Sequence, residues 1–243
     1  MAINYFAVLF QENVKPCYPR KGTFYQLEVS QSGLDCSASA WLERLTGSEI
    51  ASLYGLISMY DRQTSEHAFR TLTLIESLVW QMECCQEEVE LICLAALLHD
   101  IGKVVIPSLI LAKSGSLDET EWKIMRLHPE IGREILVRAG GIFAAVGHIV
   151  VAHHERWDGM GYPAGLAGED IPLLARILAI ADSFDAMTTS RVYQHRRSTM
   201  DARHELLNGA GHQYDPHMVA VFVSLLDQWY ERLLSIPPGA DKL

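Results

Sequence analysis

Two adjacent histidines carry the most distinctive chemistry in this chain. His153 and His154 precede a loop that contains Gly159, Gly161 and Pro163. Adjacent imidazoles on a regular helix point about 100° apart, so both can reach one ion only where the helix ends. Glycine and proline just beyond the pair are typical of a helix end. The pair is therefore a candidate metal site, and a surface pair before an ordinary loop is the alternative for the dipeptide alone.

A second candidate pair, His99 and Asp100, follows the apolar run of residues 91–98. A helix that is hydrophobic on all sides is a buried helix. Ionisable groups at its buried end must be paired or bound to a metal. We therefore interpret both side chains as candidate metal ligands.

The motifs also stand in a specific order along the chain. They are His99-Asp100 with Gly102-Lys103, His128-Pro129 with Gly132, His153-His154 with Gly161-Tyr162-Pro163, and residues 181–188 with 211–216. Over about residues 55–225 this order resembles the HD-GYP family, a branch of the HD-domain metal-dependent phosphohydrolases. The resemblance implies an all-α helical domain whose two- or three-metal site hydrolyses cyclic di-GMP, a bacterial second messenger.

The resemblance also implies a ligand set of five imidazoles and two carboxylates. The set is His67, His99, Asp100, His128, His153, His154 and Asp182. One ion would take His67, His99 and Asp182, the other would take the remaining three histidines, and Asp100 would bridge both. A set without thiolates suits iron or manganese, tolerates zinc or nickel, and argues against a closed structural zinc site.

Substrate contacts are implied in the same way. Lys103, one turn after His99, would add positive charge beside the phosphate oxygens. Arg191 matches an arginine that grips the second phosphate, although Gln194 stands where a further basic residue is usual. Tyr162, between Gly161 and Pro163, would stack or hydrogen-bond at the tip of the loop 155–172. That loop could be a wall beside the metals or a docking surface for diguanylate cyclase (GGDEF) domains.

A third ion is disfavoured by one departure from the family pattern. Family members with three metals carry a glutamate four residues before the first histidine ligand, and here that residue is Gln63. A neutral amide is a poorer ligand than a carboxylate for a hard divalent ion. Asp185 would remain as an anionic ligand for the third ion, or it could cap a neighbouring helix. We therefore predict two ions, with pGpG as the main product and slow onward cleavage to GMP.

Composition limits the alternatives. With 49% hydrophobic residues, 243 residues suffice for one buried core. A net charge of −10 argues against a nucleic-acid surface or an anionic-membrane patch. Five cysteines without a CxxC motif indicate reduced thiols, and no apolar stretch approaches the roughly 18 residues of a membrane span. We expect a cytoplasmic protein and leave homodimerisation open.

The elements that must position these residues are helices. Residues 47–243 are predicted to form the HD-domain helical bundle, and residues 1–46 an N-terminal extension of uncertain structure that could contain short strands. The expected helices are 64–82, one from a capping box at Ser116–Glu119 to His128, 142–152, 173–187 and 218–234.

Three functional hypotheses follow. The first is a cyclic di-GMP phosphodiesterase, the second is an HD hydrolase of another nucleotide, and the third is a non-catalytic module that senses the dinucleotide. The complete ligand set favours the first over a sensor, whose usual mark would be broken ligands. The intact Gly161-Tyr162-Pro163 element disfavours the second.

Overall fold

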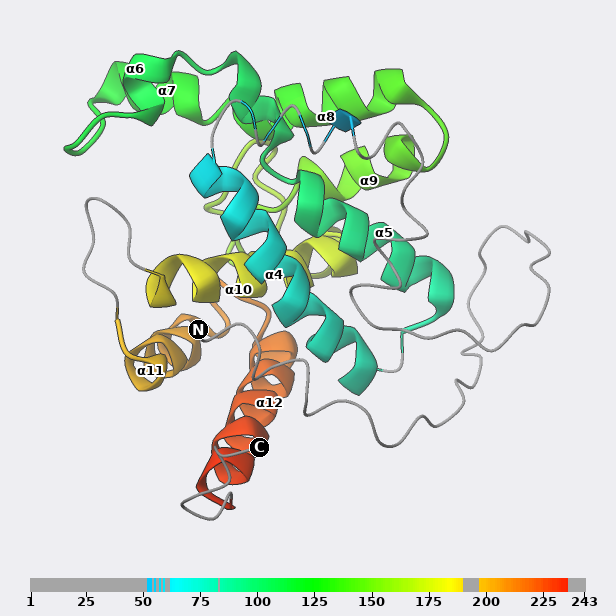
Figure 1. The fold of residues 1–243 in the computed structure, drawn as a ribbon, viewed down its shortest axis with the longest axis vertical. Coiled ribbons are helices and arrows are strands. Elements are labelled where there is room, and N and C mark those ends of the chain that lie inside the picture. The colour runs from blue at the N-terminus through cyan, green and yellow to red at the C-terminus, as the bar shows by residue number, and fades with distance from the viewer. Residues whose placement is uncertain are drawn as a thin grey trace, which may run out of the picture.

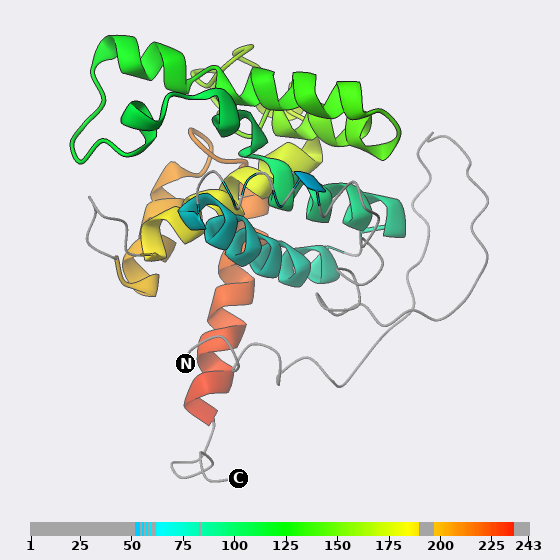
Figure 2. The same cartoon turned by 45° about the horizontal axis from the view of Figure 1, so that its top comes forward.

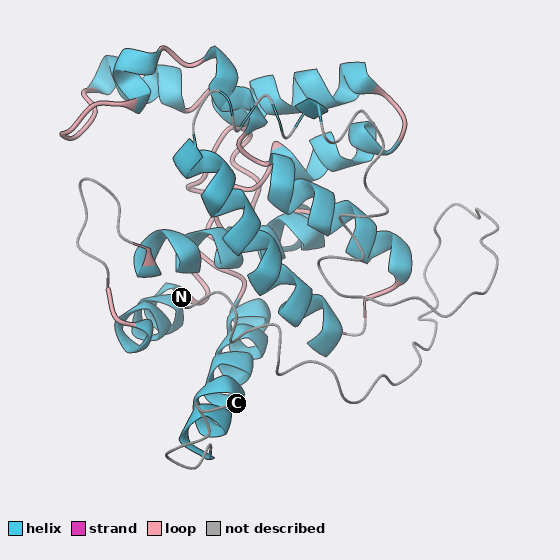
Figure 3. Ribbon diagram, viewed as in Figure 1, coloured by secondary structure: helices cyan, strands magenta, loops and turns pink. Residues whose placement is uncertain are grey.

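The computed structural model describes residues 62–82, 84–189 and 197–235, together with positions 52, 53, 55, 57 and 59. The predicted N-terminal extension, Arg191 and Gln194 lie outside these residues. The described part is all-α, as the sequence predicted, and contains no named strand (Figure 3). The boundary at residue 46 stays a prediction.

Three long helices form the centre of the bundle. They are α4 (Arg62–Gln81), α5 (Gln86–Leu98) and α10 (Leu173–Thr188), and α4 contacts both others. Helices α8 (His128–Ala139) and α9 (Ile142–Val150) pack on each other and cover one side, as the green ribbons at the top of Figure 1 show. Helices α11 (Thr199–Gly209) and α12 (Pro216–Ser235) close the other side.

Short elements connect these layers. The 3-10 helix η1 (Ile101–Val105) follows α5 and packs on α8. Helices α6 (Ser108–Leu111) and α7 (Glu119–Met125) then project to one side of the bundle in both views (Figures 1 and 2). The loop after α9 contains the 3-10 helix η2 (Gly168–Asp170) and leads into α10.

The core explains why α5 is central. Its residues from Ile92 to Leu98 are all buried, as expected for a helix that is apolar on every side. Leu72 and Ile75 of α4 and Phe222 of α12 are among the largest side chains that are fully buried in the same core. No described helix combines the length and the apolar character that crossing a bilayer requires.

The helix that was expected to begin at a capping box of Ser116 begins later. Asp118 is the N-cap of α7, and its carboxylate accepts from the backbone of Thr120 and Glu121 at 2.9 Å. Glu121 reciprocates by accepting from Asp118 N at 2.8 Å. Serine and aspartate both satisfy the pattern, and an anionic cap interacts more favourably with the helix dipole.

The expected end of that helix at His128 is also wrong. Helix α7 ends at Met125 and a new helix, α8, begins at His128. Pro129 lies in the first turn of α8, where the backbone N–H that proline lacks would have no helical partner. The predicted helices 64–82, 142–152, 173–187 and 218–234 all exist, with ends shifted by at most two residues.

Candidate metal centre

Three of the candidate histidines lie where helices end. His99 follows α5, and its Nδ1–H donates to the carbonyl oxygen of Ala96 at 2.9 Å. His128 and His153 make the same bond to the residue three positions earlier, at 2.7 and 2.5 Å. Carbonyls in the last turn of a helix have no helical partner, and here imidazoles supply one. The bond fixes the proton on Nδ1, so each Nε2 presents a lone pair.

Two of these lone pairs face each other. His128 Nε2 lies 3.4 Å from His153 Nε2. Burial lowers the pKa of His128 to about 4 and that of His153 well below its usual value, so neither ring carries the proton that could join them. Two nitrogens that each lie about 2.1 Å from one ion are roughly 3.0 Å apart when the N–metal–N angle is a right angle and roughly 3.4 Å apart when it is tetrahedral. The spacing is therefore that of two ligands of one cation.

His154 completes this arrangement. Its ring lies 3.9 Å from that of His153 and 5.0 Å from that of His128, measured between centroids. One ligand atom from each of the three rings lies within 4.8 Å of the others. We name these three residues the second ligand group.

The first ligand group consists of His67, His99 and Asp100, whose ligand atoms also lie within 4.8 Å of one another. The three side chains come from α4 and from the end of α5, and all are buried. His99 Nε2 is buried and has no hydrogen-bond partner within the described part of the chain. An unsatisfied buried acceptor is costly, and a cation would satisfy it.

Asp100 connects the two groups. Its Oδ2 lies 3.3 Å from His99 Nε2, and its Oδ1 lies 3.4 Å from His128 Nε2. Burial alone would raise the pKa of this carboxyl, but the ammonium group of Lys103, at 2.6 Å from Oδ2, holds it well below the usual range. Asp100 is thus an ionised carboxylate with one oxygen turned to each group.

His67 links α4 to α10. Its Nε2 lies 2.8 Å from Asp182 Oδ1 and its Nδ1 lies 2.6 Å from Asp185 Oδ2. Burial would lower the pKa of His67, but the two carboxylates raise it to about 9. Asp182 therefore reaches the first group through His67, and its Nε2–Oδ1 distance is also short enough for two ligands of one ion.

Asp185 already has hydrogen bonds to both of its oxygens. Oδ1 accepts from Arg70 Nε at 2.7 Å, and Oδ2 accepts from Arg70 Nη2 at 3.0 Å as well as from His67. Thr189 Oγ1 adds a bond to Oδ1 at 3.2 Å. Gln63 lies one turn before His67 and is exposed.

The loop 155–172 is anchored to the second group. Its first residue, Glu155, is buried, and its carboxylate accepts from three successive backbone N–H groups, those of residues 164, 165 and 166, at 2.7, 3.2 and 3.1 Å. Gly161 packs on the chain so closely that a Cβ there would lie 2.4 Å from Arg156 N. These contacts fix the loop against the turn that carries His153 and His154.

Tyr162 lies directly on a candidate ligand. Its N–H donates to the carbonyl of His154 at 3.2 Å, and its ring lies 4.9 Å from the His154 ring at an angle of 31°. The following bond to Pro163 is cis. The tip of the loop therefore forms one side of the second group, as a wall would.

A pocket of about 220 Å³ opens beside the second group. Among the residues that line it are Arg126, His153, His154, Tyr162, Asp182 and Tyr214. The sequence alone did not predict a role for Arg126, Glu155 or Tyr214. For Arg126 a signal existed: it stands two residues before His128 and four residues after Trp122, so arginine and indole share a helix face.

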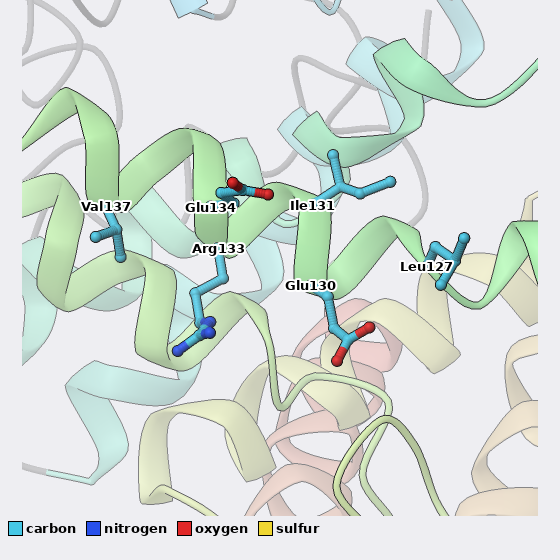
Figure 4. Close-up of a pocket in the computed structure, with 6 residues that line it drawn as sticks. All are labelled: Leu127, Glu130, Ile131, Arg133, Glu134 and Val137. Atoms are coloured by element: carbon cyan, nitrogen blue, oxygen red, sulfur yellow. The ribbon is translucent and has the colours of Figure 1, made fainter.

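A larger hollow of about 440 Å³ on the outer face of α8 contains none of the candidate ligands. It is lined by Leu127, Glu130, Ile131, Arg133, Glu134 and Val137. Figure 4 shows that these side chains leave the helix in different directions, with Ile131 and Glu130 on opposite sides of it. They do not converge on a point, and we assign this hollow no chemistry.

Known proteins that resemble this chain are HD-domain proteins and phosphodiesterases. A family model described as HD domain matches residues 51–218. A cyclic di-GMP phosphodiesterase of Vibrio cholerae is 36% identical over 74% of this chain and 39% of its own length. A 3'3'-cGAMP-specific phosphodiesterase of the same species is 38% identical over 80% of this chain and 38% of its own length. A cyclic di-GMP phosphodiesterase of Thermotoga maritima is 39% identical over 73% of this chain and 49% of its own length.

The chain thus spans less than half the length of these curated relatives. Solved structures share the fold. A cyclic GMP-AMP-specific phosphodiesterase of V. cholerae superposes with a TM-score of 0.56 at 21% identity, over 78% of this chain and 53% of that one. A phosphodiesterase HD domain of Listeria monocytogenes in complex with cyclic di-AMP gives 0.55 at 17% identity, over 76% and 98%. The chain belongs to the HD-domain family, and within it to the HD-GYP branch that its sequence resembles.

Proposed function

We propose that this chain is a metal-dependent phosphodiesterase that hydrolyses cyclic di-GMP. The observation that carries the proposal is the pair of ligand groups joined by Asp100, one oxygen to each group. Two curated relatives of similar identity are named for this activity. Such an enzyme would act in the bacterial cytoplasm, where the messenger is made.

We propose His67, His99, Asp100 and Asp182 as ligands of one divalent cation and His128, His153, His154 and Asp100 as ligands of the other. The nitrogen-rich set suits iron or manganese, and zinc or nickel would also fit. Divalent cations at these positions would supply Lewis-acid activation of water and charge neutralisation at the phosphoryl group. The buried, unsatisfied Nε2 of His99 supports this use of the site.

The protein groups around the ligands have separate tasks. Asp185 supplies no ligand atom in this proposal; its carboxylate accepts a hydrogen bond from His67 Nδ1–H and so orients Nε2. The ring of Tyr162 holds His154 by stacking. Gly161 and Pro163 shape the loop that brings Tyr162 there, and Arg191 remains a predicted contact to the second phosphate.

Lys103 is expected to stabilise charge on the phosphoryl oxygens. Its Nζ lies 2.6 Å from Asp100 and one quarter of the side chain is exposed, so it stands at the edge of the ligand groups. Lys103→Ala should lower kcat roughly a hundredfold or more while metal content stays unchanged. Paired kinetics and elemental analysis provide the measurement.

Lys113→Ala is the matched control. Lys113 lies between α6 and α7 and pairs with Glu121 of α7, and neither residue belongs to the ligand groups. It should retain the activity of the parent. Loss of metal together with activity in Lys103→Ala would show that Lys103 holds Asp100 in place and does not act on the substrate.

We also propose two ions per chain, because neither candidate for a third site is well suited. Both oxygens of Asp185 are engaged by His67 and Arg70, and position 63 is an amide. Elemental analysis and an anomalous-scattering map should show two sites in the parent. Gln63→Glu should add occupancy at a third site, whereas Gln81→Glu, the same change at the exposed far end of α4, should not.

Three full sites in the parent would refute this reading. With two ions, product analysis should show pGpG accumulating before any GMP. If GMP instead appears without pGpG, the metal count and the product assignment both fail.

The substrate itself is tested by direct comparison. A relative named as 3'3'-cGAMP-specific is 38% identical to this chain, which makes 3'3'-cGAMP the second candidate. Protein loaded anaerobically with iron or manganese should be assayed with both dinucleotides by chromatography of the products. Faster turnover of 3'3'-cGAMP would reassign the substrate. Tight binding of cyclic di-GMP without turnover would favour a sensor. Docking of GGDEF domains on the loop 155–172 and homodimerisation remain further proposals.

A further inference from the structure

Arg126, which none of the roles above uses, lies at the mouth of the pocket. It is the C-cap residue of α7 and lines the pocket together with His154 and Asp182. Its guanidinium carbon lies 5.3 Å from the centroid of the Tyr162 ring and 6.0 Å from that of the Trp122 ring. Aromatic faces at these distances hold a guanidinium by cation–π attraction and leave its in-plane N–H donors available.

Among the described residues, no carboxylate neutralises the charge of Arg126. Within the described part of the chain its guanidinium has no ion pair and no hydrogen bond to a carboxylate. Arg156, which lines the same pocket, is bound by both oxygens of Asp158 at 3.0 and 2.6 Å. The carboxylate of Glu155 accepts hydrogen bonds from backbone N–H groups of its own loop. Arg126 is therefore a positioned cation to which the described residues offer no anion.

A bound polyanion would supply the negative charge that the described residues do not. The chain carries a net charge of −10, so a polyanionic substrate gains from a local cation at the pocket mouth. An arginine held flat on an aromatic ring is suited to bidentate hydrogen bonding with a phosphate.

The position of Arg126 decides which phosphate it can reach. The ring of Tyr162 contacts both His154 and Arg126, with 4.9 Å from its centroid to that of the imidazole and 5.3 Å to the guanidinium carbon. Within the described part of the chain, Arg126 has no ion pair, hydrogen bond or ring contact with a candidate ligand, and its contact to the second ligand group runs through Tyr162. A substrate with two phosphates can therefore place one at that ligand group and the other beside Arg126.

We propose that Arg126 binds the phosphate that is not being cleaved, from its platform on Tyr162 and Trp122. This rests on the proposed function, because it requires a substrate with two phosphodiester groups. It assigns the pocket mouth a recognition role for the backbone that all cyclic dinucleotides share.

The experiment compares Arg126→Ala and Arg126→Lys with the parent and with Arg133→Ala. Arg133 is a matched control, since it is exposed, lies seven residues along the chain and lines the hollow on the outer face of α8. Dissociation constants for cyclic di-GMP and cyclic di-AMP are measured by calorimetry. Hydrolysis of bis(p-nitrophenyl) phosphate, which has a single phosphate, is measured alongside, with metal content by elemental analysis.

Arg126→Ala should weaken binding of both dinucleotides by the same factor, about 10- to 100-fold, as loss of a hydrogen bond to a charged group predicts. Arg126→Lys should fall between Arg126→Ala and the parent, because lysine keeps the charge but not the planar donors. KM and kcat for bis(p-nitrophenyl) phosphate, metal content and the Arg133→Ala variant should all match the parent.

Several results would overturn the inference. A loss confined to cyclic di-GMP would mean that Arg126 reads the guanine edge, and lower metal content would mean that it acts only by holding Tyr162 on His154. If Arg126→Ala binds the dinucleotides as the parent does and the parent turns over normally, the phosphate-binding role of Arg126 is refuted and the proposed function stands. If binding depends on Arg126 but the parent shows no turnover, the role of Arg126 stands and the proposed function is refuted. A parent that binds no cyclic dinucleotide refutes both the role of Arg126 and the proposed function.

Discussion

Asp100→Ala is expected to abolish hydrolysis of cyclic di-GMP. The side chain offers one oxygen to each ligand group, so its loss would remove a ligand from both of the proposed ions at once. Loss of a partner outside the ligand shell typically costs 10- to 100-fold in metal affinity or activity, and the loss of a shared ligand should exceed about a thousandfold. Turnover and metal content per chain are the measurements.

Two variants make this result interpretable. Asp100→Asn keeps the size of the side chain while removing its charge, so the buried site should fold and still lose activity. Asp170→Ala removes an exposed carboxylate in η2 and should leave turnover unchanged. Retained turnover in either Asp100 variant would exclude a site that depends on Asp100 as the shared ligand.

The second large effect is expected on stability, in Gly102→Ala. A Cβ at Gly102 would lie 1.9 Å from His128 O and 2.7 Å from Gly132 N, so the added methyl meets backbone atoms that cannot rotate away. Helix α8 would have to separate from η1. Overpacking usually costs 1–3 kcal/mol, and a clash with rigid backbone should cost more than about 3 kcal/mol. At roughly 2–4 °C per kcal/mol for a domain of this size, Tm should fall by about 10 °C.

The same separation would pull His128 away from Asp100, so the variant should also bind less metal. Gly115→Ala is the control, since a Cβ there would meet nothing within 4 Å. Calorimetry of the two variants beside the parent makes the comparison. A Tm of Gly102→Ala within about 2 °C of the parent would mean that α8 and η1 can move apart without cost, contrary to rigid packing.

The helices that carry the site could be predicted because their signals are local. The apolar run 91–98 alone indicates a buried helix with His99 and Asp100 at its end, and α5 has that form. Adjacent histidines before glycines indicate a helix end, and α9 ends at Val150, just before them. The capping box was misplaced because serine at 116 and aspartate at 118 fit the pattern about equally well.

What the sequence could not predict depends on distant contacts. From the sequence, Asp185 could be a ligand of a third ion or a helix cap. Only the packing of α10 against α4 reveals that it accepts a hydrogen bond from His67 Nδ1–H, 118 residues away in sequence. Arg126 gave a local signal through Trp122, but its second aromatic partner, Tyr162, belongs to a different loop. Pairing of that kind follows from the tertiary fold, which periodicity does not encode.

The hydrogen bonds between histidine Nδ1 and helix-end carbonyls couple the fraying of helix ends to the binding of cations. His99, His128 and His153 are each bound through Nδ1 to the last turn of α5, α7 or α9, which leaves Nε2 as the candidate ligand atom. Fraying of any of these turns would free an imidazole to rotate, and cation binding would in turn hold the turn closed. By thermodynamic linkage, the free energy of closing three helix ends is part of the free energy of metal affinity. Mutations that only loosen a helix terminus, with no contact to the ligands, are therefore a route by which evolution could tune how tightly the ions are held.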